Sequence, residues 1–154
     1  MNGDVRAIEY LNNILGNELI AINQYFLHSK MYQHWGFTKL AVIAKKDSMD
    51  EMKHADALAA RILTLDGLPN FQKLGKLSIG QTAQEALTCD LQLEQQAMPA
   101  LKEAISYLES VQDFASRSLL NKILAEEEDH AEWLATQLDL INTIGLENYL
   151  QQQV

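Results

Sequence analysis

Two short motifs of this chain, each a glutamate followed three positions later by a histidine, combine residue types that bind metal ions. Each motif begins 33 positions after a further glutamate, and an offset of 76 residues superposes one set of three on the other. The six residues are Glu18, Glu51, His54, Glu94, Glu127 and His130. One such motif is a weak signal. Two copies, each with a third acid at the same distance, predict two metal half-sites in a pseudo-twofold relation, the ligand set of a di-iron or di-manganese centre in a four-helix bundle.

The helices that must position these ligands are indicated by apolar residues spaced three and four apart in four stretches of the chain. All six predicted ligands fall within these apolar stripes, as Glu18 does between Leu15 and Ile22. Side chains at i and i+3 lie on one helix face, so the glutamate and the histidine of each motif can reach the same centre.

Two ordinary roles compete with metal binding for such residues. A lone motif of this kind usually lies on a solvated helix surface, and a buried glutamate can pair with lysine or arginine. Burying an unpaired carboxylate is costly, and the positions that form the four stripes include no lysine or arginine. Two metal ions between the carboxylates would supply the missing positive charge, so the sequence predicts a dinuclear site.

The first two helices have recognisable limits. Asp4 is expected to cap the first helix, which runs to about His34 and is broken at Gly36. Thr38 can cap the second helix, and the turn residues 66–69 end it.

The second half of the chain contains a long connection and further helices. Residues 70–81 show no sustained periodicity and are expected to cross along the bundle. A capping box at 82–85 opens the third helix, which Pro99 should kink or strain locally. A fourth helix is expected over 113–145, and a short fifth helix or tail over 146–152. Two helical hairpins joined by a long crossover have the ferritin-like topology.

The composition is that of one globular domain, residues 1–154, with 47% hydrophobic residues. A formal net charge of −9 argues against nucleic-acid binding. The single cysteine, Cys89, excludes an internal disulfide and a four-cysteine metal centre, and suits a reducing compartment. No apolar run resembles a signal peptide or reaches the roughly 18 residues of a membrane span. We therefore expect a cytoplasmic protein that binds neither membrane nor nucleic acid.

Over nearly its whole length the chain resembles bacterioferritin. The resemblance is carried by residues 15–19 (LGNEL), 21–28 (AINQYFLH), 50–56 (DEMKHAD), 67–70 (GLPN), 74–77 (LGKL) and 145–150 (GLENYL). It implies an all-α, ferritin-like four-helix bundle with a long crossover between the second and third helices and a short fifth C-terminal helix.

The resemblance also implies a function. Bacterioferritins are iron-storage proteins and ferroxidases, which oxidise Fe2+ with O2 or H2O2 and keep ferric mineral inside a hollow shell of twenty-four subunits. Such a shell can be a homo-oligomer or a mixture of subunits, and a ferredoxin can supply the electrons for iron release.

By resemblance, the ferroxidase centre uses the same six residues that the spacing selects. Glu51 and Glu127 would bridge the two iron ions, the first glutamate of each set would be a terminal ligand, and one histidine would bind each iron. Tyr25 and Trp133 match positions beside the centre and could donate electrons when oxidation is incomplete; core packing is the alternative role for both.

Met52 separates this family from haem-free ferritins. It directly follows the predicted bridging residue Glu51, so it points about 100° away from the metal stripe. By resemblance, two Met52 side chains from twofold-related subunits are the axial ligands of one haem b, flanked by Leu19, Asn23 and Phe26. Considered without the family, an outward methionine favours an interface contact.

Three neighbouring positions depart from the family pattern. Many members carry an aromatic residue, a histidine and a glutamate where this chain has Lys45, Lys46 and Asp47. Lys45 would alter the surroundings of the haem. In some members the histidine forms an inner-surface iron site with Asp50, and a charged Lys46 cannot serve as that ligand, so the cation route would depend on Asp50 and Asp47.

The remaining histidines have no acid three or four positions later. We expect both His28 and His34 on the surface, and weak candidates for an iron entry pore are His34, Asp66, Glu132 and Asp139.

Three other functions fit parts of the pattern. A di-iron peroxidase of the rubrerythrin type would need a four-cysteine iron module, which Cys89 alone cannot provide. A non-catalytic haem-bearing subunit of a mixed shell would suit the lysines at 45 and 46 but not the intact set of six ligands. A DNA-protecting mini-ferritin is disfavoured, because its site lies between subunits and it lacks the fifth helix.

Overall fold

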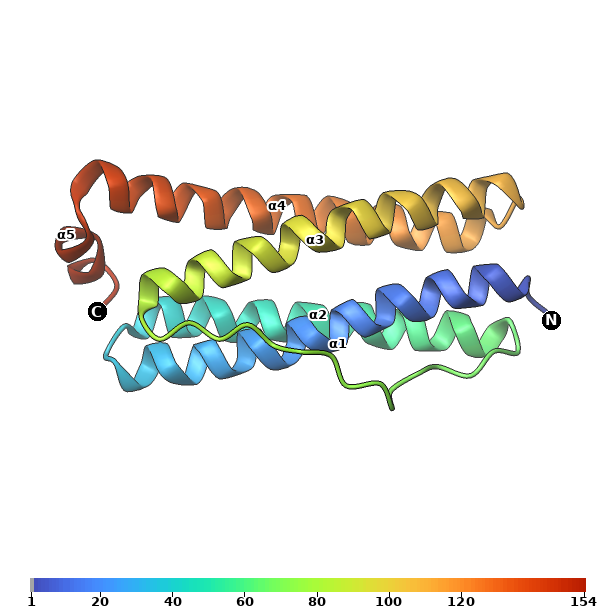
Figure 1. Ribbon diagram of the computed structural model, residues 1–154, viewed down its shortest axis with the longest axis horizontal. Coiled ribbons are helices and arrows are strands. Elements are labelled where there is room, and N and C mark those ends of the chain that lie inside the picture. Colours follow the sequence, from blue (N-terminus) through green and yellow to red (C-terminus); the bar gives the residue numbers. More distant parts are fainter. Residues whose placement is uncertain (1) are drawn as a thin grey trace.

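The computed structural model describes residues 2–154 and contains five helices in that range. Four long helices lie side by side as two hairpins, and the short fifth helix turns across one end of the bundle (Figure 1). The elements are α1 (Val5–His34), α2 (Thr38–Thr64), α3 (Ala83–Ser110), α4 (Phe114–Ile144) and α5 (Leu146–Gln151). The all-α prediction is confirmed, and each helix ends close to the expected position.

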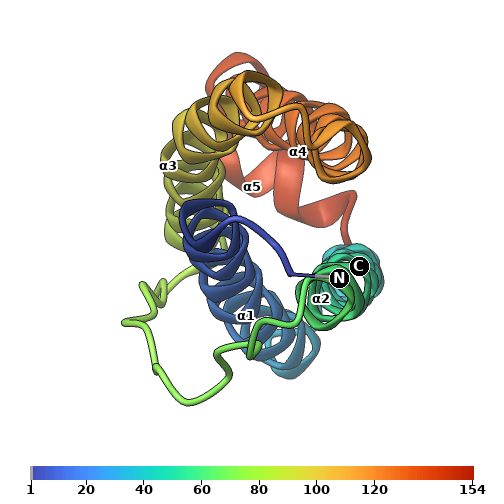
Figure 2. The same ribbon diagram turned by 90° about the vertical axis from the view of Figure 1, so that its right-hand side faces the viewer.

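The connection between α2 and α3 runs the length of the bundle along the outside of α1 (Figure 1, Figure 2). Its residues bond to side chains of α1 on the way: the Asn70 backbone N–H donates to Asn12 Oδ1 at 2.8 Å, and the Ser78 N–H donates to Gln24 Oε1 at 3.0 Å. This confirms the predicted crossover. No helix within 2–154 combines the length and the apolar character needed to cross a membrane.

Polar side chains cap the helices largely as predicted. Asp4 accepts a hydrogen bond from the Arg6 N–H, and Thr82 Oγ1 accepts one from the Glu85 N–H at 3.2 Å. The Glu85 carboxylate reaches back to the N–H of Gln81 at 2.7 Å, one residue further than in the usual capping box. These bonds satisfy N–H groups that have no partner inside the helix.

One detail of the helix ends differs from expectation. Thr38 is the first residue of α2 and not its cap; the N-cap is Phe37, whose side chain makes no capping bond. After α2 the left-handed conformation is adopted by Asp66, with φ of 61°, and not by the neighbouring glycine. The third helix continues through Pro99 as one element, although proline leaves a carbonyl of the preceding turn without its helical donor.

The apolar core has two parts, one toward each end of the bundle. One is built around Leu11, Leu15, Leu58, Ile62, Leu101, Leu108 and Leu120. The other contains Tyr32, Leu40, Leu87, Leu134, Ile141 and Tyr149. The six predicted ligands come from the segments between these two clusters, so a polar layer interrupts an otherwise apolar bundle.

His28 is fully buried, and its expected surface position is wrong. Its Nδ1 lies 2.8 Å from Asp90 Oδ1, and its Nε2 accepts a hydrogen bond from the Gly80 backbone N–H at 3.0 Å. Asp90 also accepts from Gln24 Nε2 at 2.9 Å. The partner acid belongs to α3 and the donor to the crossover, so no local spacing could reveal this network. His34 is exposed, as predicted.

Replacing His28 by phenylalanine is expected to destabilise the protein. The ring volume is largely kept, but Asp90 loses a buried partner and the Gly80 N–H loses its acceptor, at a cost of about 2–4 kcal/mol. Chemical unfolding of the assembled protein measures the loss, and faster proteolysis within 70–81 should accompany it. The exposed His34→Phe variant is the control; equal stability of the two variants would contradict the assigned role of this network.

Candidate metal centre

The two hairpins bring three side chains each to the middle of the bundle. Those of α1 and α2 form one set and those of α3 and α4 the other. Five of the six are buried, and the sixth, His130, keeps only 12% of its side chain exposed. The structure therefore gathers every residue that the spacing selected: Glu18, Glu51, His54, Glu94, Glu127 and His130.

Their ligand atoms form two overlapping groups, and within each group all the atoms lie within 4.8 Å of one another. Glu51 and Glu127 belong to both groups. One group is completed by the glutamate of α1 and the histidine of α2, the other by the glutamate of α3 and the histidine of α4. Two shared carboxylates between two half-sites are the arrangement that bridging ligands require, and the ligand roles themselves stay a prediction.

The four buried carboxylates have too little positive charge around them. No lysine or arginine within 2–154 forms an ion pair with any of the four. Buried oxygens of Glu51, Glu94 and Glu127 have no hydrogen-bond partner. Burial raises the pKa of Glu94 to about 8, with its contact to Glu127 adding to the shift. The cluster is rich in anionic oxygens, and some of these oxygens have no hydrogen-bond partner. Such a cluster fits two hard divalent cations.

Each histidine turns one ring nitrogen toward these carboxylates. His54 Nδ1 lies 3.3 Å from both Glu18 Oε2 and Glu127 Oε1, and His130 Nδ1 lies 3.0 Å from Glu94 Oε1. Burial alone would lower the pKa of His54, but the nearby carboxylates of Glu127 and Glu51 outweigh burial and raise the pKa to about 11. Burial is likewise outweighed at His130, where bonds to Asp47 and Glu94 raise the pKa to about 11. Without metal, the protons on the two histidines supply the positive charge beside the carboxylates.

Metal binding is therefore expected to release protons. The raised pKa values of His54, His130 and Glu94 all lie above pH 7, so these three groups carry protons at that pH. A metal ion binds the deprotonated ligands, so it must displace these protons. Saturation with Zn2+ should release roughly three protons per subunit, and the affinity should rise between pH 6 and 8. Calorimetric titration in buffers of different ionisation enthalpy counts the protons. Release of fewer than about one would contradict the assignment.

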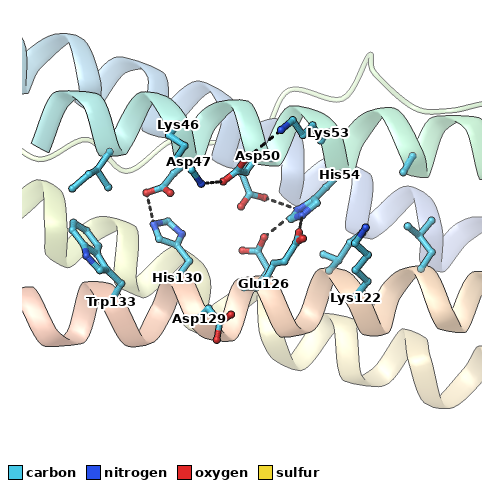
Figure 3. Close-up of a pocket in the computed structure, with 16 residues that line it drawn as sticks. Lys46, Asp47, Asp50, Lys53, His54, Lys122, Glu126, Asp129, His130 and Trp133 are labelled. Carbon is cyan, nitrogen blue, oxygen red and sulfur yellow. Dashed lines mark hydrogen bonds and ion pairs between the residues drawn. The ribbon is translucent and has the colours of Figure 1, made fainter. Parts of the chain in front are cut away.

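Two further carboxylates contact the histidines from outside the group of six. His130 Nε2 lies 2.8 Å from Asp47 Oδ2, and His54 Nε2 bonds to Glu126 (Figure 3). The sequence interpretation missed Glu126 and considered Asp47 only as part of a cation route. The sequence positions of these two acids gave little indication of the contacts. Glu126 is adjacent to a predicted ligand, and each acid lies on the helix across the cavity from the histidine that it contacts.

Tyr25 lies beside the centre, as predicted. Its buried hydroxyl donates a hydrogen bond to Glu94, and its ring meets that of His130 edge-on with centroids 5.1 Å apart. Burial, with the charge of Glu94, holds the pKa of Tyr25 well above its usual value, so the phenol stays protonated. Trp133 is half-buried and lines the cavity next to His130 (Figure 3).

A cavity of about 720 Å³ lies between α2 and α4 and connects the centre to the surface (Figure 3). Both histidines and both shared glutamates line it, and charged side chains surround its outer part: Lys46, Asp50, Lys53, Lys122, Glu126 and Asp129. The centre is thus open to the surface within one subunit.

Asp50, the candidate inner-surface ligand, is already paired. Lys46 Nζ lies 2.8 Å from Asp50 Oδ2, and Lys53 Nζ lies 3.9 Å from Asp50 Oδ1. Hydrogen bonding to Asp50 also raises the pKa of Lys46. Lys46 therefore pairs with this part of the predicted cation route, whereas Asp47 bonds to His130.

The remaining predicted positions lie away from the centre. Met52 is 52% exposed on the outer face of α2, with Phe26 of α1 also 48% exposed. The four candidates for an entry pore are all exposed and lie near helix ends or along α4: His34, Asp66, Glu132 and Asp139. A pore between subunits stays a prediction.

Comparisons with known proteins agree on one family. A model of the ferritin-like domain, "Ferritin", matches residues 8–144. The chain is 49% identical over 154 residues to bacterioferritin of Mycobacterium leprae (strain TN), covering 100% of this chain and 97% of that protein. It is 46% identical over 150 residues to bacterioferritin of Streptomyces coelicolor, covering 97% and 90%. A bacterial ferritin of Pseudomonas aeruginosa is 46% identical over 155 residues, with both chains covered completely. The chain belongs to the bacterioferritin family, the iron-storage ferritins that oxidise iron at a buried glutamate and histidine centre.

Proposed function

We propose that the six residues of the centre bind two iron ions in each subunit, with Glu51 and Glu127 bridging them. The observation that carries this proposal is the overlap of two donor groups that share these two carboxylates. Within residues 2–154 no lysine or arginine pairs with these carboxylates, and this and the unsatisfied buried oxygens support the proposal. Glu18 and Glu94, each in one group only, are the terminal ligands.

The arrangement suits the two-electron oxidation of ferrous iron by O2 or H2O2. The two shared carboxylates would hold both metals close enough for them to act on one oxidant. Carboxylate oxygens are hard ligands and favour the ferric over the ferrous ion. The Tyr25 hydroxyl orients Glu94 and is the nearest phenol able to give up an electron, with its proton passing to that carboxylate.

The proposal extends to the assembly and its cofactor. The whole chain, 1–154, acts as one domain in a cytoplasmic shell of twenty-four subunits, of one kind or mixed, which stores the ferric product. Two Met52 thioethers from twofold-related subunits would hold one haem b; the exposure of Met52 and Phe26 supports this, because both side chains are free to meet a cofactor and a second subunit. Electrons from a ferredoxin would release the iron, and neither membrane nor nucleic acid takes part.

Anaerobic titration with Fe2+, followed by admission of O2, tests the central claim. The rapid absorbance change should saturate near two irons per subunit, and a crystal soaked in ferrous salt should contain both metals inside one subunit. Saturation at one iron, or metals only between subunits, would contradict the proposal.

Replacing Lys46 by histidine is expected to speed the mineralisation phase that follows the first oxidation. The lysine ammonium holds Asp50 at 2.8 Å and competes with Fe2+ for it. Removing an exposed pair of this kind should raise the later rate by roughly twofold or more and leave the first phase unchanged. The difference should shrink in about 1 M salt, where charges are screened.

Iron uptake at several hundred irons per shell measures that effect. The matched control is Lys45→His, which removes the same charge from an exposed residue that does not line the cavity. Equal rates for the two variants in both phases would show that Lys46 has no part in the route.

A further inference from the structure

Both histidines of the centre use both ring nitrogens. While each Nδ1 faces the buried glutamates, each Nε2 contacts an acid that the metal set does not include. His130 of α4 meets Asp47 of α2 at 2.8 Å, and His54 of α2 bonds to Glu126 of α4. Figure 3 shows the two contacts crossing the cavity in opposite directions.

The chemistry of imidazole makes these contacts directional. An ionised carboxylate only accepts hydrogen bonds, so each Nε2 must carry the proton that it donates. The Nδ1 lone pair of a neutral ring is then the one left for a metal, and the ring cannot rotate without breaking its outer bond. Carboxylates placed in this way around metal-binding histidines fix the tautomer and the ring orientation.

We propose that Asp47 and Glu126 are positioning residues, which hold His130 and His54 in the orientation and tautomer that bind the metal pair. This inference depends on the proposed dinuclear centre. Each half-site is thereby tied to the opposite hairpin, because its histidine and its outer carboxylate come from helices on opposite sides of the cavity.

The two outer carboxylates break the internal symmetry of the centre. The 76-residue offset places Glu126 on Asp50 and Asp47 on Ile123, so the two acids are not equivalent positions. Asp47 is short and keeps 18% of its side chain exposed, whereas Glu126 is longer and 49% exposed. Forming the bond to histidine therefore costs Asp47 less side-chain entropy than it costs Glu126, and water competes less for the Asp47 carboxylate. The half-site of His130 therefore depends more on its outer carboxylate than that of His54 does.

Anaerobic titration with Co2+, followed by its visible absorption bands, tests this role without iron chemistry. Wild-type assembled protein should bind two Co2+ per subunit. Asp47→Ala and Glu126→Ala should each weaken one of the two sites by about 10–100-fold, with the larger loss for Asp47→Ala. Asp47→Asn and Glu126→Gln keep an oxygen that accepts from Nε2 and should recover most of the affinity and the wild-type spectrum.

The control is Asp129→Ala, which removes one negative charge from the same cavity. Asp129 points away from both rings, and neither ring nitrogen bonds to it within the part of the chain described (Figure 3). Its loss should change the affinity by less than about threefold. Should an alanine variant fail to assemble, a leucine at the same position, similar in volume and unable to accept a hydrogen bond, replaces it in the comparison.

The outcomes separate the two claims. Wild-type protein that does not take two Co2+ would refute the dinuclear centre itself. Wild-type protein that takes two, together with alanine variants that bind like Asp129→Ala, would overturn the positioning role alone. Losses that the amide variants do not recover would also overturn it, since charge and not ring orientation would then be the cause.

Discussion

Replacing Glu127 by alanine is expected to abolish the rapid oxidation of Fe2+ while the shell still assembles. Glu127 is one of the two carboxylates shared by both donor groups, so its loss would remove the proposed bridge and a donor from each half-site at once. The fast phase should fall by more than about 100-fold, beyond the 10–100-fold usual for residues that only support a ligand. Stopped-flow absorbance after mixing with Fe2+ and O2 measures it.

The stability of the metal-free variant should not fall. Burial raises the pKa of Glu127, and its loss relieves repulsion among the buried carboxylates, while His54 keeps its contacts with Glu18 and Glu126. Glu128→Ala is the matched control, because Glu128 is the next residue of α4 and is exposed. An oxidation trace for Glu127→Ala that overlays the Glu128→Ala trace would refute the bridging role.

Replacing Met52 by alanine should remove the proposed haem and leave iron oxidation intact. Met52 follows Glu51 in sequence but lies on the outer face of α2, and it does not line the cavity that leads to the centre. The variant would lack the thioether that is proposed to hold the haem, and it would lack it in both of the equivalent subunits. The Soret absorbance per subunit should fall nearly to zero, while the stopped-flow trace matches wild type.

Met49 provides the control for this variant. It is another exposed methionine of α2, 56% exposed, so Met49→Ala removes a comparable apolar side chain from the same helix. Haem content that is unchanged in Met52→Ala, or reduced equally in both variants, would make Met52 an interface residue and not an axial ligand.

The position of the donor groups bears on the alternative functions. Both groups are formed within one chain, which differs from a mini-ferritin site built between subunits. The complete set of six side chains, all turned inward, also argues against a purely structural subunit. A rubrerythrin-type peroxidase would still need the cysteine module for which the single Cys89 is insufficient.

Local patterns were enough to identify the helices and the six residues of the centre. Helical periodicity is a short-range property, so apolar stripes locate the four long helices and caps such as Asp4 and Thr82 mark their ends. The ligands were visible because they interrupt those stripes at a spacing of one helical turn, and because the pattern occurs twice. Charged residues in an apolar stripe stand out even without coordinates.

Contacts between elements could not be read in the same way. His28 appeared to be a surface residue because its partners, Asp90 and Gly80, lie 62 and 52 positions away along the chain. Asp47 and Glu126 likewise gain their role only when α2 and α4 face each other across the cavity. Hydrogen bonds between helices depend on how the helices are packed and rotated, and a helical repeat carries no information about which residue of another helix will lie opposite.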